Sequence, residues 1–332
     1  MRIIILKLEE KIRGEYEMRY ILILLVAFII SFLLTKPLIK LSQKIGFTDK
    51  PTKRKAHAEP IPLSGGIGIY VGFFIVFLSL VTELPEHKLW IFIAATLILF
   101  IGIFDDTYKS RKKEFPILPR LIVQLFAAYF VYRAGIVSRG FVNPFTNEYV
   151  LLPEYLQCIL TITWIFGVTT VINWSDGMDG LAGGVSVVSA LTFFFAALIL
   201  GQTTSAETSI CLVGAIIGFL IYNKYPAQVF MGDSGANVIG FLLAIIALDG
   251  AFKQATVMSL FLPIFALAVP IFDNIFVIFK RLFEGKPVYQ ADRSQIHFRL
   301  KSKGMSTRQV VNFIIFISLI FSTISIVLLL IK

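Results

Sequence analysis

The chain has 332 residues, of which 57% are hydrophobic and only 16% are charged. Soluble domains carry roughly 25% charged residues, so this composition excludes an ordinary water-soluble protein. The net charge of +10 is explained by lysine and arginine placed beside membrane helices, and no nucleic-acid partner is predicted. The two cysteines, Cys158 and Cys211, lie in apolar runs and are interpreted as packing residues rather than a disulfide or metal site.

Apolar runs that are long enough, or nearly so, to cross a bilayer about 30 Å thick recur along the whole chain. They cover residues 20–34, 67–82, 89–104, 119–135, 155–172, 185–200, 208–222, 236–251, 257–279 and 308–331. The run 257–279 is long and contains two prolines, so this ninth helix is expected to be bent or broken. The sequence therefore predicts an all-α membrane protein of about ten transmembrane helices. Residues 1–19 are interpreted as an N-terminal tail and 20–331 as a single polytopic domain.

Lysine and arginine set the orientation of these helices. With ten crossings, one side holds 21 of the 31 lysines and arginines, in loops 36–66, 105–120, 173–184, 223–235 and 280–308. The positive-inside rule makes this side cytoplasmic and places both termini outside. We therefore expect a multi-pass protein of the inner (plasma) membrane.

Aspartate is also distributed unequally. Seven of the nine aspartates fall in or beside the predicted cytoplasmic loops: Asp49, Asp105, Asp106, Asp176, Asp179, Asp233 and Asp292. The topology rule hardly acts on aspartate, so membrane orientation does not explain this clustering. It indicates a functional site at the cytoplasmic face.

The first motif is Asp105-Asp106 at the inner end of the third predicted helix. Two carboxylates at the end of a membrane helix are costly unless they bind something. Neighbouring side chains on a helix point about 100° apart, so the two acids should have different roles. The alternative is an ordinary cap of the helix end.

The second motif contains Asn173, Asp176 and Asp179, followed by several glycines. Their three-residue spacing predicts one stripe along a helix. Oxygen-only ligands suit Mg²⁺, with Mn²⁺ as an alternative ion, and do not suit zinc. The alternative is a glycine-rich turn with solvated aspartates.

The third motif is Gly232-Asp233-Ser234-Gly235, immediately before the eighth predicted helix. The start of a helix offers free N–H groups to an anion. Ser234 is expected to cap this helix, and Asp233 is placed to hold a metal that bridges to phosphate. Plain capping is the alternative.

Basic residues border the same face in several loops. Arg293 and His297 lie in the last loop, while Arg54 and His57 lie in the first. Arginine suits phosphate oxygens, although topology and contact with anionic lipid explain such basic runs equally well.

Three further polar residues sit at or within the apolar runs. Lys109 follows the first motif, and Arg120 begins the fourth helix, where it is placed either to reach a diphosphate or to extend to the membrane interface. Asp273 lies within the run 257–279. An acid in the membrane is a candidate functional residue, with bonding to backbone freed by the bend as the alternative.

Together these motifs resemble the polyprenyl-phosphate N-acetylhexosamine-1-phosphate transferases, in the WecA/TagO branch that is related to MraY. The resemblance covers roughly residues 20–331 and rests on five motifs in order. They are Arg54-Lys55-x-His57 with Gly65-Gly66, Asp105-Asp106, Asn173-x-x-Asp176-Gly-x-Asp179-Gly, Gly232-Asp233-Ser234-Gly235, and Pro270-x-x-Asp273 leading into Asp292-Arg293.

The resemblance implies transfer of N-acetylglucosamine-1-phosphate, or a related hexosamine phosphate, from a UDP-sugar to polyprenyl phosphate. It implies Mg²⁺ ligands at Asn173 and Asp233, and catalytic roles for Asp105, Asp106 and Asp176. Asp105 would meet the lipid phosphate, with Asp106 supporting it. Membrane lipids are implied partners, and family analogy also suggests a homodimer.

Substrate-binding positions also follow from the resemblance. Asp179 would contact the uracil, while Arg120 and His297 would hold the diphosphate and the sugar. The remaining implied substrate-binding residues are Arg293, Lys109, Arg54 and His57. The branch usually has His-Ile-His-His where this chain reads Gln295-Ile296-His297-Phe298, so the motif leaves the exact sugar open.

Two rival functions remain open at this stage. An MraY-like transferase would use UDP-MurNAc-pentapeptide, although this chain lacks the run of three histidines usual in that branch. A secondary transporter would also suit ten helices with an acid in the membrane. Transporters place ionisable residues near the midplane, however, whereas here most acids fall at the predicted inner boundary.

Overall fold

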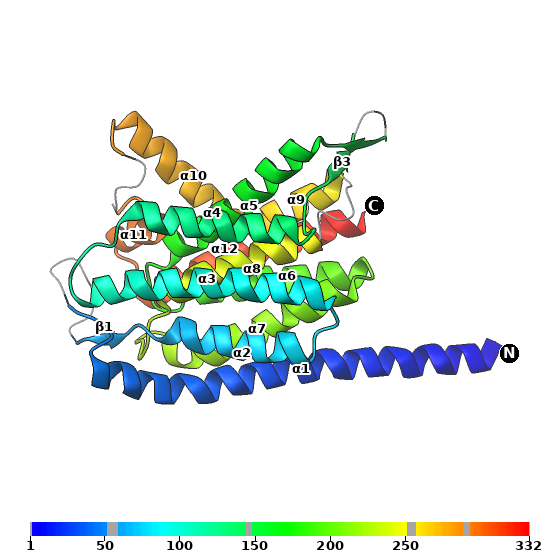
Figure 1. The fold of residues 1–332 in the computed structure, drawn as a ribbon, viewed down its shortest axis with the longest axis horizontal. Helices are drawn as coiled ribbons and strands as arrows, with labels where there is room; N and C mark the ends of the chain where they lie inside the picture. Colours follow the sequence, from blue (N-terminus) through cyan, green and yellow to red (C-terminus); the bar gives the residue numbers. More distant parts are fainter. Residues whose placement is uncertain are drawn as a thin grey trace.

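The computed structural model describes residues 2–51, 59–143, 146, 148–250, 257–287 and 293–331. Long helices dominate them, and the only strands in these residues form two short hairpins (Figure 1). The helices are α1 (Arg2–Ile45), α2 (Gly65–Ser79), α3 (Pro85–Ser110), α4 (Ile117–Arg133), α5 (Glu154–Ser175), α6 (Leu181–Ile199), α7 (Thr203–Asn223), α8 (Gly232–Asp249), α9 (Val257–Ala266), α10 (Ala268–Phe283), α11 (Ile296–Ser302) and α12 (Thr307–Leu330).

The strands pair in chain order. Strand β1 (Thr48–Asp49) is antiparallel to β2 (Ile61–Pro62), and Thr48 lies opposite Pro62. Strand β3 (Gly140–Val142) is antiparallel to β4 (Tyr149–Leu151), and Gly140 lies opposite Leu151. Both hairpins join consecutive helices, so they connect the bundle rather than form a core of their own.

Seven helices of the described residues are long and apolar enough to cross a membrane: α1 from Glu17, α3 from Glu86, α5, α6, α7, α8 and α12. The chain is therefore an all-α, multi-pass membrane protein. Each of the ten predicted apolar runs overlaps helical residues, and the run 257–279 falls on α9 and α10. A count of about ten crossings and a bent ninth helix remain predictions. Helix α1 crosses the predicted boundary at residue 20, so the division into tail and domain also remains a prediction.

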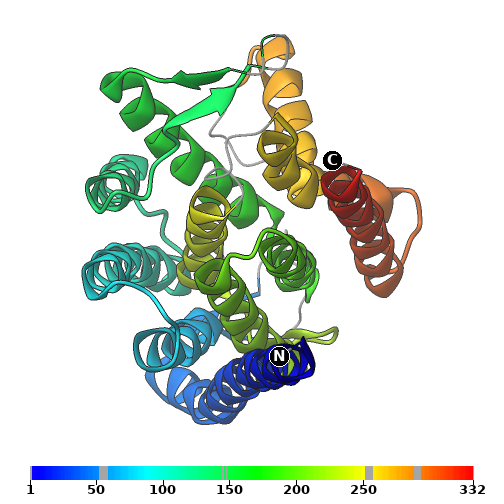
Figure 2. The same cartoon turned by 90° about the vertical axis from the view of Figure 1, so that its right-hand side faces the viewer.

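Helix α8 lies at the centre of the bundle, with α3, α5, α2 and α7 packed against it (Figure 2). In its most apolar stretch 94% of the residues are buried, against 22% for the peripheral α1. Glycines permit this close packing, because a Cβ at Gly102 of α3 would overlap the backbone of Ser234, and one at Gly66 would overlap Gly235. The neighbouring helix ends are thereby held against the start of α8.

The bundle has two distinct ends (Figure 1). Both termini and β3 lie at one end, which we call the opposite end. The other end carries β1, α11, the last turns of α3 and α5, and the start of α8. We call it the acidic end, because the Asp105-Asp106 pair and Asp233 lie there.

Candidate active site

Asp105 and Asp106 lie in the last two turns of α3, and both side chains are buried. Asp105 Oδ2 accepts a hydrogen bond from Arg120 Nη1 of α4 at 2.6 Å. Asp106 instead faces the start of α8. Adjacent residues of a helix point about 100° apart, and this angle sends the two carboxylates to different partners.

Asp106 caps helix α8. Its Oδ1 accepts the backbone N–H of Asp233 at 2.8 Å, and its Oδ2 accepts that of Ser234 at 3.0 Å. The prediction that Ser234 caps this helix is wrong, since the Ser234 hydroxyl is buried without a hydrogen-bond partner. The idea that the start of α8 offers free N–H groups to an anion is also wrong for these two groups, because Asp106 already accepts their hydrogen bonds.

Gly232 explains why the motif needs glycine before Asp233. Its φ of +72° lies in the left-handed region that side chains rarely adopt. A Cβ there would also lie 2.5 Å from Asp106 Oδ2. The glycine therefore lets the Asp106 carboxylate reach the helix start.

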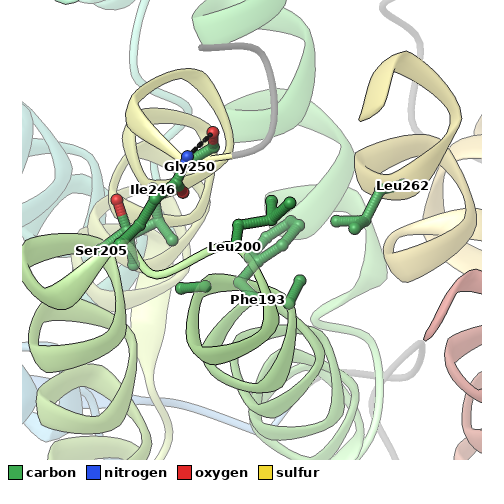
Figure 3. A pocket seen from close by; sticks show the side chains of 9 residues that line it. Phe193, Leu200, Ser205, Ile246, Gly250 and Leu262 are labelled. Carbon is green, nitrogen blue, oxygen red and sulfur yellow. Dashed lines mark hydrogen bonds between the residues drawn. The ribbon is translucent and has the colours of Figure 1, made fainter. Parts of the chain in front are cut away.

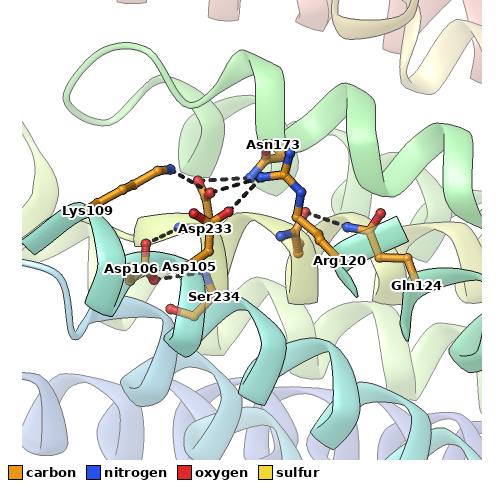
Figure 4. Close-up of polar contacts among 9 residues, drawn as sticks. Asp105, Asp106, Lys109, Arg120, Gln124, Asn173, Asp233 and Ser234 are labelled. Atoms are coloured by element: carbon orange, nitrogen blue, oxygen red, sulfur yellow. Dashed lines mark hydrogen bonds and ion pairs between the residues drawn. The ribbon is translucent and has the colours of Figure 1, made fainter. Parts of the chain in front are cut away.

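Asp233 is the centre of the polar cluster shown in Figure 4. Lys109 Nζ donates to its Oδ2 at 2.5 Å, and Asn173 Nδ2 donates to its Oδ1 at 3.2 Å. Arg120 Nη1 lies 3.6 Å from the same Oδ2. Helices α3, α4 and α5 thus each supply one of these side chains to a single carboxylate of α8.

Asn173, Asp176 and Asp179 do not form the predicted helical stripe. Helix α5 ends at Ser175, and Asp176 has non-helical angles of φ −81° and ψ 58°. The Asp179 carboxylate turns away and accepts the N–H of Ala227 at 3.0 Å. The glycines on both sides of Asp179 favour a turn over a helix, which is why the three-residue spacing was misleading.

The half-buried Asp176 lies within the electrostatic reach of this cluster. Burial, reinforced by the negative charge of Asp233, raises the pKa of the Asp176 carboxyl to about 7. Lys109 acts in the other direction. A positive charge placed near Asp176 and Asp233 would lower this pKa again.

His297 reaches the same turn from helix α11. Its side chain is buried, Nε2 has no hydrogen-bond partner, and a Cβ at Gly177 would overlap the imidazole ring. Burial lowers the pKa of His297 to about 4, so the ring is neutral at pH 7. Arg293 lies exposed just before α11, whereas Arg54 and His57 lie outside the described residues.

Several polar residues that the sequence analysis did not select also organise this end. Asn223 Oδ1 accepts the N–H of Gly180 at 2.9 Å, and its Nδ2 donates to Val229 O at 2.8 Å. One helix turn further along α4 and α8 than Arg120 and Asp233, Gln124 Nε2 donates to Asn237 Oδ1 at 3.4 Å, and Gln124 lies beside Arg120 in Figure 4. The position of Gln124 and Asn237 as amides within apolar runs was a usable signal, whereas Asn223 directly follows such a run.

The cluster fits a divalent cation by charge and by donor type. Four carboxyl groups, Asp105, Asp106, Asp176 and Asp233, share two cationic side chains, Lys109 and Arg120, so full ionisation of the four would leave two negative charges for a bound cation to balance. The Asn173 amide lies against Asp233, and the assignment of its O and N atoms can be exchanged. Mg²⁺ takes one or two carboxylate ligands and completes its shell with water and phosphate oxygens. Among the described residues, no group of three or more acidic, histidine or cysteine side chains is placed to hold a metal ion by itself.

A small pocket at the opposite end does not belong to this site. Phe193, Leu200, Ile246 and Leu262 line it, with Ser205 as one of its polar members (Figure 3). None of the described residues that line it is acidic or basic, and none belongs to the predicted site.

Comparison with known proteins gives consistent matches. The family model described as glycosyl transferase family 4 matches residues 88–251, which include Asp105 and Asp233. The probable undecaprenyl-phosphate N-acetylglucosaminyl 1-phosphate transferase of Bacillus subtilis (strain 168) is 36% identical over 309 residues, covering 92% of this chain and 85% of that protein. The undecaprenyl-phosphate alpha-N-acetylglucosaminyl 1-phosphate transferases of Yersinia pestis and Escherichia coli (strain K12) are each 29% identical, covering 81% of this chain and 73% of theirs.

Proposed function

Because the chain belongs to the family of undecaprenyl-phosphate N-acetylglucosaminyl 1-phosphate transferases, we propose that it moves N-acetylglucosamine-1-phosphate from UDP-N-acetylglucosamine to undecaprenyl phosphate. Family membership confirms the resemblance inferred from the motifs. The observation that carries the proposal is the buried acidic cluster around Asp233, which lies at one end of an apolar helix bundle. A polyprenyl chain stays in the bilayer and a UDP-sugar stays in water, so their phosphates meet only at such an end.

In the proposed topology about ten segments cross the inner membrane and the acidic end faces the cytoplasm. The excess of lysine and arginine in the loops at this end supports the orientation. The crossing at 257–279 would be bent where α9 ends and α10 begins. Cysteine labelling from each side of the membrane tests the topology, and cross-linking in membranes tests the predicted homodimer.

The proposed reaction is an in-line displacement at phosphorus. An oxygen of the lipid phosphate attacks the UDP-sugar phosphorus that carries the sugar. The P–O bond to the bridging oxygen breaks, and its electron pair leaves with UMP. The second pKa of a phosphate monoester is about 6, so the acceptor is largely dianionic at neutral pH and needs no strong base. Positioning and charge neutralisation supply most of the rate.

Asp105, Asp106 and Asp176 have separate roles in this proposal. Asp105, held by Arg120, orients the lipid phosphate or accepts its residual proton. Asp106 acts as a positioning residue, because its carboxylate binds the backbone at the start of α8. Asp176 adds negative charge beside Asp233.

Asn173 and Asp233 would hold Mg²⁺, or Mn²⁺ in its place. When bound, the cation neutralises charge on the donor diphosphate. The excess of negative charge in the cluster and the oxygen donors of both residues support this assignment. Lys109 pairs with Asp233 at 2.5 Å, and in this proposal its ammonium group would contact the phosphates of the substrates.

The remaining residues would bind the substrates. Asp179 is proposed to contact the uracil, with Arg120 and His297 on the diphosphate and sugar. A neutral His297 acts there as a hydrogen-bonding group rather than as a cation. Further proposed substrate contacts come from Arg293, Lys109, Arg54 and His57.

The lipid chain is proposed to lie along α10. This helix exposes a row of large apolar side chains, among them Phe272, Phe276 and Phe279. Replacing Phe279 with aspartate should raise the KM for lipid phosphate far more than the KM for UDP-sugar. A larger effect on the nucleotide would contradict this location.

A UMP-release assay with the purified protein, undecaprenyl phosphate and competing UDP-sugars tests the proposed function. Release from UDP-N-acetylglucosamine that requires the lipid supports it, and a preference for UDP-MurNAc-pentapeptide would favour the MraY-like alternative. Substrate flux in sealed vesicles without UMP release would favour a transporter. Labelled phosphosugar trapped on the protein without lipid would replace direct attack by a covalent intermediate.

A further inference from the structure

Asp273 of α10 forms a connection that the proposed reaction does not use. Both of its carboxylate oxygens lie 2.9 Å from the backbone N of Ile296, which is the first residue of α11. Only 8% of the Asp273 side chain is exposed. An acid within the run 257–279 therefore caps the start of a helix in the next segment of the chain.

Arg299 strengthens this connection one turn further along α11. Its Nη2 donates to Asp273 Oδ1 at 2.8 Å, and its guanidinium stacks over the Phe276 ring of α10 at 4.2 Å from the centroid. A charge-assisted bond and a stacking contact thus fix one face of α11 to α10.

The other side of α11 carries His297. This residue lies between Ile296 and Arg299, and its buried ring contacts Gly177 in the turn that follows Asp176. A single short helix therefore links Asp273 on one side to the Asp176 turn on the other. The position of the imidazole depends on where α11 is held.

The adjacent Asn274 serves a different purpose. Its Nδ2 donates to Pro270 O at 2.8 Å and to Val171 O at 3.2 Å. Asn274 thus satisfies backbone carbonyls of α10 and α5. The Ala266 carbonyl freed by Pro270 accepts a hydrogen bond from Ser189 Oγ at 2.6 Å, so that backbone role belongs to neither Asp273 nor Asn274.

We propose that Asp273 is a positioning residue, which holds α11 through Ile296 and Arg299 so that His297 is presented to the UDP-sugar. This inference rests on the proposed function for its substrate. Ile296 and Leu300 also pack against the apolar cluster that contains Leu181, Val185 and Ile314. Loss of the carboxylate should therefore leave α11 attached but free to shift.

The kinetic test uses Asp273→Ala, Asp273→Asn and His297→Ala. Misplacement of a binding group by about 1 Å can cost up to about 100-fold. We expect Asp273→Ala to raise the KM for UDP-sugar about tenfold and to leave the KM for lipid phosphate within about twofold. Asp273→Asn keeps an acceptor for Ile296 and should give a smaller increase.

A double-mutant cycle distinguishes positioning from general damage. In a His297→Ala background, Asp273→Ala should raise the KM for UDP-sugar less than about twofold further. Asn274→Ala is the matched control from the same helix turn, and its effect should add to that of His297→Ala. Equal effects of Asp273→Ala in both backgrounds, or equal rises in both KM values, would overturn the proposal.

Hydrogen exchange supplies a readout that needs no turnover. Amides of residues 296–303 should exchange at least about tenfold faster in Asp273→Ala, with no such change in Asn274→Ala. Unchanged exchange would overturn the proposed link even in an active enzyme. Faster exchange in a protein that releases no UMP would instead reject the proposed function and retain the link between α10 and α11.

Discussion

At the opposite end of the bundle, the buried Glu207 of α7 pairs with Arg19 of α1 and also accepts the N–H of Thr82 at 2.5 Å. Arg19 Nη2 donates in turn to Leu80 O and to Thr82 Oγ1, at 2.5 and 2.7 Å. One acid and one base are satisfied there. At the acidic end, four carboxylates share two cations. The comparison teaches that a buried ion pair alone does not mark a site, whereas an excess of one charge does.

The largest expected effect comes from Asp233→Ala, because this carboxylate is contacted by Lys109, Arg120 and Asn173. UMP release should fall by about 1,000-fold or more. Asp249→Asn is the control, as Asp249 binds Ser205 Oγ at the opposite end and its loss should leave the rate within about twofold. Full turnover in Asp233→Ala would remove the central residue of the proposal.

Chelation of divalent ions should have the second-largest effect on UMP release. The excess negative charge around Asp233 requires compensation, so EDTA should lower UMP release by at least about 100-fold, and added Mg²⁺ should restore it. The Arg19–Glu207 pair combines one acid with one base and needs no cation. EDTA should therefore not change the thermal stability that this pair contributes at the opposite end. Activity that survives exhaustive chelation would exclude a required metal.

Replacing Asp106 should mainly lower stability, whereas replacing Asp105 should mainly lower activity. Asp106→Ala leaves the N–H groups of Asp233 and Ser234 without their acceptor, which should cost about 3 kcal/mol of unfolding free energy. Asp105→Ala removes no such cap and should reduce UMP release at nearly unchanged melting temperature. Thermal unfolding in detergent measures both, and equal destabilisation by the two variants would contradict the assigned roles.

Arg19→Ala should affect stability alone. It leaves the buried Glu207 with the Thr82 N–H but without a cation. Because 41% of the Arg19 side chain is exposed, we expect a loss of about 2 kcal/mol rather than the larger cost of a fully buried pair. Adding Glu207→Gln to the Arg19→Ala protein should recover part of this lost unfolding free energy. A selective rise in the KM for UDP-sugar would show that the two ends are coupled.

A further expected effect concerns the dependence of stability on pH. The pKa of Asp176 is raised from the ordinary 3.8 to about 7, so the folded chain binds more protons than the unfolded chain between these values. Metal-free protein should therefore lose stability as pH rises from about 4 to about 7. Asp176→Asn should flatten this dependence, and an identical pH profile in both proteins would show that Asp176 does not cause it.

Much of the site could be predicted from residue types and their order. Asp105, Asp106, Asn173 and Asp233 were selected from sequence, and the structure brings all four together with Lys109 and Arg120. Ser234 was misassigned as a cap, because the sequence could not show that a carboxylate from α3 reaches the start of α8. The predicted helical stripe of Asn173, Asp176 and Asp179 is wrong, because the glycines that follow end α5 at Ser175.

The sequence by itself determined the class of protein, the apolar runs, the unequal charge of the two faces and the family. These depend on composition and on short-range order, which a linear chain already contains. Only the tertiary structure decided that Asp106 caps α8, that Asp273 holds α11, and that Asp105, Lys109 and Arg120 meet around Asp233. Each of these joins residues that lie more than 20 positions apart, and such pairings are fixed by helix packing rather than by local sequence.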